Sequence, residues 1–259
     1  MSGILELDSL TQRINQMNME RKLVVITGAS SGFGREMAKL FAEAGHPLLL
    51  LARRLEKMEA LELPHTVCRK VDVTDRVGFE AAVLEAEAEF GPTDLLVNNA
   101  GVMMLGDIAS QNPQEWKLMM DVNVLGVLNG MQIVMPGMKE RKTGTIINVA
   151  SIAGLQPFAN HGAYCASKYG VVGLSQVARA ELAAHNVRVL HICPGAVETE
   201  LLGHTTDSNI IKGYNEWKES VGATNITALD VARTIQFAYE LPQSVSLREI
   251  VIADTQQDA

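Results

Sequence analysis

From residue 23 onward, short apolar runs alternate with longer stretches in which apolar residues recur at helical spacing. The apolar runs cover residues 23–27, 48–51, 66–71, 95–97, 145–149, 187–192 and 250–252. Strands that are apolar throughout, rather than at every second residue, are typical of a parallel sheet with helices on both faces. The chain has 259 residues and no internal repeat or low-complexity linker. The pattern therefore predicts one α/β domain.

The segment before residue 21 lacks this alternation. Leu10, Ile14 and Met17 recur there at roughly helical spacing, after Asp8 and Ser9, either of which could cap a short helix. We therefore predict an N-terminal extension over residues 1–20 and the folded domain over residues 21–259. The extension could be an arm that packs on a partner subunit, or a frayed tail.

The charge and the cysteines exclude several classes of protein. A formal net charge of −8 leaves no broad cationic face, so we predict that neither nucleic acid nor an anionic membrane is a partner. The longest strongly apolar run, residues 46–52, is expected to be far too short to cross a bilayer. Cys68, Cys165 and Cys193 are too few and too scattered for a disulfide framework or a thiolate metal site. We predict no metal and a reducing, cytoplasmic location.

A glycine-rich turn stands between the first apolar run and the first helical stretch. From Thr27 to Gly34 its glycines are spaced G-x-x-x-G-x-G, rather than in the commoner dinucleotide spacing G-x-G-x-x-G. Glycines at such a turn accept a positive φ and let the backbone approach a pyrophosphate, whose charge the helix N-terminus stabilises. Because a strand precedes it and a helix follows it, the turn predicts a nucleotide site rather than a simple bend.

Two arginines, Arg53 and Arg54, end the second apolar run, where an NAD site usually places an acid against the ribose hydroxyls. A guanidinium group can instead clamp a 2′-phosphate through charge-assisted hydrogen bonds. The alternative is that both arginines merely solvate a loop. With the glycine turn upstream, NADP(H) is favoured over NAD(H). Asp72, after the third run, is a candidate for the adenine edge or for a helix cap.

Tyr164 and Lys168 lie four residues apart, on one face of a predicted helix. A free tyrosine, with a pKa of about 10, is a weak acid–base catalyst at neutral pH, and a nearby ammonium group favours the phenolate. Alone, this spacing is common and mostly structural. Ser151 and residues 98–101 follow two other apolar runs, at the sheet edge where open α/β sheets bind ligands. Asn123, inside an otherwise apolar helix, needs buried partners.

The motifs and their order along the chain resemble those of the short-chain dehydrogenase/reductase family, in its NADP-preferring branch. The matching motifs are residues 27–34, residues 98–101, Asn123, Ser151, the Tyr164-x-x-x-Lys168 pair and Pro194-Gly195. Each motif is moderately specific, whereas their joint, ordered occurrence is highly specific. The resemblance covers about residues 21–253. It implies a single Rossmann-type, doubly wound catalytic domain whose seven-stranded parallel sheet has the order 3-2-1-4-5-6-7.

The resemblance also implies a reaction and the roles of the matching residues. Tyr164 would be the general acid in reduction and the general base in oxidation, and Lys168 would lower its pKa and hold the nicotinamide ribose. Ser151 would orient the substrate oxygen, and Asn123 would hold a water joining Lys168 to a proton relay. The reaction would be hydride transfer between NADP(H) and a small carbonyl or alcohol. The rival from another class is a nonenzymatic NADP(H)-binding sensor or scaffold on the same fold.

The implied cofactor site combines the glycine turn, the arginines and the loops after the strands. Its residues are Gly28, Ser30, Ser31, Gly32, Phe33, Gly34, Arg53, Arg54, Asp72, Val73, Asn99, Ala100, Gly101, Tyr164, Lys168, Pro194, Gly195, Val197 and Thr199. Some NADP-preferring members carry a basic residue in place of Ser31, so the 2′-phosphate would rest mainly on the two arginines. Residues 197–226 are expected to form a lid over the substrate. Gln156, Phe158 and His161 are candidates for the pocket wall, and the family implies a homotetramer or homodimer.

Overall fold

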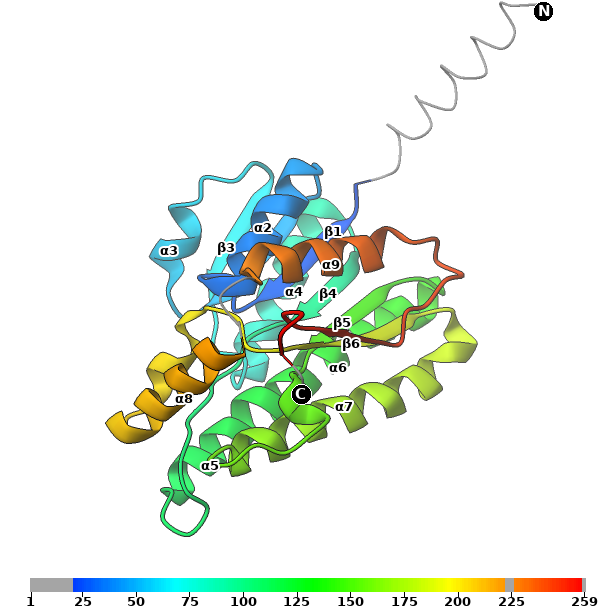
Figure 1. Cartoon of the computed structure of the whole chain (residues 1–259). Helices are drawn as coiled ribbons and strands as arrows, with labels where there is room; N and C mark the ends of the chain where they lie inside the picture. The colour runs from blue at the N-terminus through cyan, green and yellow to red at the C-terminus, as the bar shows by residue number, and fades with distance from the viewer. Residues whose placement is uncertain (1–20, 222–225, 258–259) are drawn as a thin grey trace, which may run out of the picture.

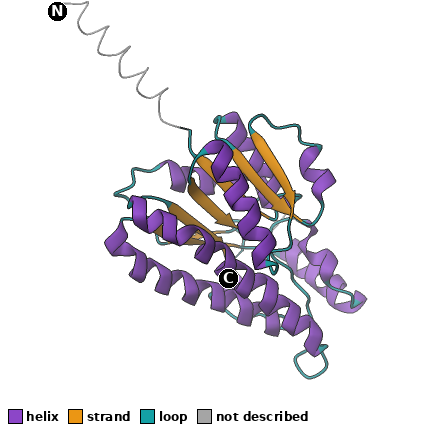
Figure 2. Ribbon diagram, turned by 180° about the vertical axis from the view of Figure 1, so that it is seen from behind, coloured by secondary structure: helices purple, strands orange, loops and turns teal. Residues whose placement is uncertain are grey.

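The computed structural model describes residues 21–221 and 226–257. In these residues, seven parallel strands form one sheet in the order β3-β2-β1-β4-β5-β6-β7. Helices cover both faces of the sheet (Figures 1 and 2). The predicted single Rossmann-type α/β domain and its strand order are confirmed. The predicted N-terminal extension, residues 1–20, lies outside the described residues.

The strands follow the predicted apolar runs closely. They are β1 (Leu23–Thr27), β2 (Leu48–Ala52), β3 (Thr66–Lys70), β4 (Thr93–Asn98), β5 (Thr145–Val149), β6 (Arg188–Pro194) and β7 (Glu249–Ile252). The α-helices are α2 (Gly32–Glu43), α3 (Leu55–Glu59), α4 (Arg76–Phe90), α5 (Pro113–Met120), α6 (Gly126–Arg141), α7 (Gly162–Leu182), α8 (Ser208–Ser220) and α9 (Ala228–Glu240). A π-helical turn, η1 (Asp121–Leu125), joins α5 to α6, and the short 3₁₀ segments are η2 (Ile152–Gly154), η3 (Ala183–His185) and η4 (Glu200–His204).

The apolar runs are continuous because both faces of the sheet are buried. Leu23 and Val25 of β1 pack into the core layer that includes Phe79 of α4 and residues of α6 and α7. Val24 and Ile26, the alternate residues, pack into the opposite layer with α2 and α9. All four side chains are inaccessible to solvent. Because successive side chains of a strand point to opposite faces, each strand contributes to both core layers.

One helical stretch among the described residues, Pro113–Arg141, is long and apolar enough to pass the length and composition test for a membrane span. Its mean hydropathy reaches 1.4, so it is a longer apolar segment than residues 46–52. In the fold, Met131, Val134 and Met138 of this stretch pack in the core beneath the sheet. The burial of that face accounts for the apolar composition.

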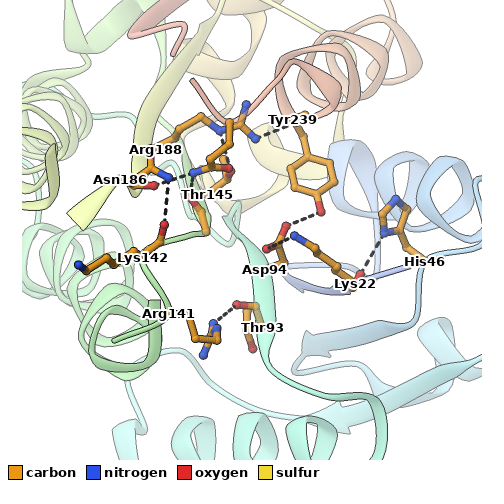
Figure 3. A network of polar contacts seen from close by, with 12 residues as sticks. Lys22, His46, Thr93, Asp94, Arg141, Lys142, Thr145, Asn186, Arg188 and Tyr239 are labelled. Atoms are coloured by element: carbon orange, nitrogen blue, oxygen red, sulfur yellow. Dashed lines mark hydrogen bonds and ion pairs between the residues drawn. The ribbon is translucent and has the colours of Figure 1, made fainter. Parts of the chain in front are cut away.

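A polar network lies at the amino ends of the strands (Figure 3). Arg188 Nε donates to Thr145 Oγ1 at 3.0 Å, and its Nη2 donates to the carbonyl oxygen of Tyr239 at 2.8 Å. The Tyr239 hydroxyl donates to Asp94 Oδ2 at 2.8 Å, while Lys22 Nζ donates to Asp94 Oδ1 at 3.1 Å. These bonds tie α9 to β4, β5 and β6. The predicted site residues gather at the other end of the strands.

Candidate active site

A cavity of about 500 Å³ opens at the carboxyl ends of the strands, where parallel α/β sheets bind their ligands. Most predicted site residues line it, namely Gly28, Ser30, Ser31, Gly32, Phe33, Arg53, Arg54, Asp72, Val73, Asn99, Ala100, Gly101, Ser151, Tyr164, Lys168, Pro194, Gly195, Val197 and Thr199. Gly34 and Asn123 do not reach its wall. Of the three pocket candidates, Phe158 and His161 line the cavity and Gln156 does not.

The glycine turn approaches its neighbours too closely for side chains. A Cβ on Gly28, whose φ is +67°, would stand 2.8 Å from the Cα of Ala100. A Cβ on Gly34 would collide with the carbonyl oxygen of Gly28. Gly34 therefore allows α2 to pack against β1, whereas Gly28 brings bare backbone to the cavity. The turn therefore presents bare backbone to the cavity beside the N-terminus of α2, the kind of cradle that holds a diphosphate.

Thr27 fixes this turn to the end of β4, a role that the sequence analysis missed. Its Oγ1 accepts hydrogen bonds from the backbone N–H groups of Asn99 and Ala100, at 2.9 and 3.0 Å. The Asn99 side-chain amide donates back to the Thr27 carbonyl oxygen at 2.9 Å. A hydroxyl at the last position of a buried strand was the signal that could have revealed it, because such a group needs a partner.

The two arginines at the end of β2 have different surroundings. Arg54 Nη2 donates to Ser30 Oγ at 3.2 Å and to Ser31 Oγ at 3.0 Å, and Nη1 donates to Glu200 Oε2 at 2.7 Å. Arg53 is exposed and makes no ion pair or side-chain hydrogen bond with any residue that the structure describes. Two guanidinium groups and two hydroxyls beside the glycine cradle fit the phosphates of a dinucleotide carrying a 2′-phosphate.

Asp72 serves a local turn and also faces the cavity. Its Oδ1 accepts from the backbone N–H and from the hydroxyl of Thr74, at 3.0 and 2.7 Å. The same residue lines the cavity beside Val73. The interpretation of Asp72 as the cap of the following helix is wrong, because Asp75 caps α4 by accepting from the backbone N–H of Gly78. The contact of Asp72 with the adenine edge stays a prediction, which its place on the cavity wall allows.

Tyr164 and Lys168 share one buried face of α7, and each is 5% exposed. Lys168 Nζ lies 5.7 Å from the centroid of the Tyr164 ring and donates to the carbonyl oxygen of Val149 at 2.9 Å. Ser151 follows β5, hydrogen-bonds Tyr164, and accepts from the backbone N–H of Ala153 at 3.1 Å. A phenol, a hydroxyl and an ammonium group thus converge on one part of the cavity wall.

Burial has the largest effect on the pKa values of Tyr164 and Lys168. It raises the pKa of Tyr164 above the ordinary tyrosine value, and the hydrogen bond with Ser151 opposes that rise. Burial also lowers the pKa of Lys168 to about 8. The sequence analysis expected Lys168 to lower the pKa of Tyr164, but in this structure desolvation outweighs the other influences. The ammonium group is hydrogen-bonded to the Val149 carbonyl.

Asn123 lies in the π-helical turn η1 and is fully buried. Its Oδ1 accepts from the backbone N–H of Val102 at 2.8 Å, and its Nδ2 donates to the Val102 carbonyl oxygen at 2.9 Å and to Ser167 Oγ at 3.0 Å. The side chain therefore ties the loop after β4 to α7. The expected water between Asn123 and Lys168 stays a prediction. π-helical turns are rare and often found at functional sites.

The structure describes residues 197–221 and residue 226 of the expected lid. It contains η4, capped by the Thr199 hydroxyl, and α8, capped by the carboxylate of Asp207. From this segment, Leu201, Leu202, Tyr214 and Trp217 reach the cavity wall. Residues 222–225 lie outside the described residues. Glu200, at the start of η4, is a further lining residue that the sequence analysis did not single out.

The sheet order, the glycine cradle and the Ser–Tyr–Lys group together define the class of nucleotide-dependent oxidoreductases with a Rossmann-like fold. The family model described as short chain dehydrogenase matches residues 22–209. The chain belongs to the short-chain dehydrogenase/reductase family, as the sequence predicted.

The chain is similar over most of its length to several relatives. An uncharacterised oxidoreductase of Staphylococcus saprophyticus is 37% identical over 246 residues, which cover 93% of this chain and 98% of that protein. Glycine betaine reductase of Emericella nidulans is 39% identical over 237 residues, which cover 89% of this chain and 18% of that much longer protein. Among solved structures, the closed form of serine dehydrogenase complexed with NADP⁺ has a TM-score of 0.81 and 30% identity, covering 92% of this chain and 96% of that one.

Proposed function

We propose that this protein is an NADP(H)-dependent oxidoreductase that transfers a hydride between the nicotinamide and a small carbonyl or alcohol. One observation carries the proposal. Tyr164, Lys168 and Ser151 meet on the wall of the same cavity whose other end is the glycine cradle. A proton donor beside a dinucleotide cradle is the arrangement that carbonyl reduction requires.

The residues of this chain would supply the proton and the positioning. When bound, NADP(H) supplies the hydride in reduction and accepts it in oxidation. The Tyr164 hydroxyl gives its proton to the substrate oxygen as the carbonyl carbon is reduced, and takes it back in oxidation. Ser151 holds that oxygen by a hydrogen bond, and Lys168 stabilises the tyrosinate that forms. Asn123 keeps α7 in register with the loop after β4.

The preference for NADP(H) over NAD(H) rests on the end of β2. Arg53 offers an exposed guanidinium with no partner among the described side chains, and Arg54 already bonds the hydroxyls of Ser30 and Ser31 beside the cradle. Neither position holds the carboxylate that would accept a hydrogen bond from the ribose 2′-hydroxyl of NAD. The serine dehydrogenase structure, which contains NADP⁺, supports the same choice.

The names of two relatives favour a small polar substrate. Serine and glycine betaine each carry a cationic nitrogen close to the oxygen-bearing carbon. We therefore propose that compounds of this size and polarity are the substrates.

The proposal is tested by following NADPH consumption across a panel of small aldehydes and ketones with the purified protein. Turnover of at least one compound, with NADH much less effective, is the expected result. Tight NADPH binding without turnover of any compound would instead support the nonenzymatic sensor or scaffold.

We also propose a cytoplasmic homotetramer or homodimer. Large apolar side chains are exposed on the helices that cover one face of the sheet, namely Leu118, Met120, Leu125, Tyr169 and Val177. A partner subunit would bury them. Cys68, Cys165 and Cys193 are all free thiols, in accord with a reducing compartment.

A further inference from the structure

The substrate end of the cavity is walled by four aromatic side chains, which we call the aromatic wall. Phe158 and His161 come from the loop before α7, whereas Tyr214 and Trp217 come from α8. The ring centroids are 5.6 Å apart for Phe158–His161, 5.8 Å for His161–Tyr214, 5.5 Å for Tyr214–Trp217 and 5.8 Å for Phe158–Trp217. Each of the four side chains thus contacts two of the others, and all four residues line the cavity.

The aromatic wall carries no positive charge at neutral pH. Burial lowers the pKa of His161, so its imidazole is neutral, and burial raises the pKa of Tyr214 to about 12, so its phenol is neutral. The neighbouring cation, Lys218, is itself paired with the carboxylate of Glu198. A cation entering this space would therefore meet four uncharged aromatic side chains and an ion pair with no net charge.

The wall also lies beside the proton donor. The His161 ring centroid is 6.3 Å from that of Tyr164. A group held by the wall would thus be separated from the reacting carbon by a short spacer. The position suits a substrate with two ends, one for the aromatic rings and one for the Tyr164 hydroxyl.

Aromatic rings arranged around a cavity bind alkylated ammonium groups through cation–π attraction when the cation lies within about 6 Å of the ring centroids. We infer that the aromatic wall of Phe158, His161, Tyr214 and Trp217 binds the trimethylammonium group, or a similar alkylammonium cation, of an amino aldehyde or amino alcohol. This inference rests on the proposed function, since it names the substrate class of the same site. The competing reading is that the wall binds any bulky apolar group.

The two readings are separated by a pair of aldehydes with the same shape. Betaine aldehyde carries a trimethylammonium group, and 3,3-dimethylbutanal carries a tert-butyl group of nearly the same size and no charge. With NADPH saturating, we expect kcat/KM for the cation to exceed that for the neutral aldehyde by at least about tenfold, because a desolvated cation is attracted by the aromatic rings whereas the tert-butyl group is not. Equal values, or a preference for the neutral aldehyde, would overturn the inference.

Variants localise the effect to the wall. Trp217→Leu is expected to lower the ratio of the two kcat/KM values by about fivefold or more, and Tyr214→Leu provides a second, independent removal of a ring. Trp116→Leu is the matched control, because Trp116 does not line the cavity, and it should leave the ratio unchanged. A ratio that survives both wall variants would contradict the assignment.

A binding measurement keeps this inference distinct from the proposed function. The chain has two tryptophans, so Trp116→Phe leaves Trp217 as its single tryptophan. In the presence of NADP⁺, tetramethylammonium chloride should change the Trp217 emission saturably, whereas sodium chloride at equal ionic strength should not. Saturable binding without turnover of either aldehyde, or of any other compound in the panel of aldehydes and ketones, would refute the proposed oxidoreductase and leave the cation site standing. Turnover without a saturable response would refute the cation site alone, and failure of both would refute both.

Discussion

Arg54 donates a 2.7 Å hydrogen bond from Nη1 to the Oε2 atom of Glu200, and so joins the end of β2 to the start of η4. Lys57 Nζ reaches the other oxygen of the same carboxylate at 3.3 Å. These two bonds lower the pKa of Glu200, that from Arg54 more strongly. In our account Arg54 also serves the 2′-phosphate, so the carboxylate competes with the cofactor for one guanidinium group.

Glu200→Gln should therefore tighten NADPH binding. Because the pair is exposed to solvent, the expected gain is modest, about two- to fivefold in Kd. Fluorescence titration with NADPH measures it. Glu198→Gln, which removes a carboxylate paired with Lys218 rather than Arg54, is the control and should bind NADPH like the unmodified protein. Weaker NADPH binding in Glu200→Gln would mean that the carboxylate helps to hold the cofactor.

Replacing both Arg53 and Arg54 by glutamine should weaken NADPH far more than NADH. Each guanidinium lost from a phosphate contact costs about 1.5–3 kcal/mol, so the preference for NADPH should fall by at least about a hundredfold when both are removed. The Kd values of both cofactors are compared in the double variant. Arg35→Gln removes a cation outside the cavity and should leave the preference intact. Equal losses for the two cofactors would refute the phosphate clamp.

The reduction should lose activity above about pH 8. Burial lowers the pKa of Lys168 to about 8, so its stabilising ammonium is present below that pH and disappears above it. Burial raises the pKa of Tyr164, so the phenol keeps its proton through the same range and does not cause the fall. The pH profile of kcat/KM for NADPH-dependent reduction measures this. Lys168→Arg, if active, should lack the falling limb, since a guanidinium stays charged. A flat profile in the unmodified protein would contradict the role of Lys168.

The network at the amino ends of the strands should contribute to stability rather than to turnover. Tyr239→Phe removes the donor to the buried carboxylate of Asp94, at an expected cost of about 1–2 kcal/mol in the free energy of unfolding. Urea unfolding measures the loss. Tyr169→Phe removes a hydroxyl from a tyrosine that is 46% exposed, and should change stability by less than about 0.5 kcal/mol. A similar loss in both variants would show that the Asp94 bond is not the cause.

The sequence predicted the fold and most of the cavity wall because those features are local. Continuous apolar runs mark buried parallel strands wherever they occur, and the residues just after such runs must meet at one edge of the sheet. Gly28 and Ser151 could thus be placed together without knowledge of any contact between them. Tyr164 lies within α7 rather than just after a strand, and its place at the site was implied by the family resemblance.

The features that the sequence analysis missed depend on contacts between distant segments. Glu200 meets Arg54 across 146 positions, and the backbone N–H of Ala196 donates to Gln257 Oε1 at 3.0 Å, which brings the C-terminal segment against the loop after β6. Residues 121–125 carry no signal that distinguishes a π-helical turn from an α-helix. Likewise, burial, which local spacing does not reveal, raises the pKa of Tyr164, and the lowering expected from Lys168 stays a prediction.

Tyr164→Phe is the decisive variant, because it removes the transferable proton and keeps the ring. We expect NADPH-dependent reduction to fall by at least about a thousandfold, while the Kd for NADPH, measured by fluorescence in the same preparation, changes less than about threefold. A variant that binds NADPH normally and still turns over at close to the original rate would show that another group donates the proton, and would refute the mechanism proposed for this site.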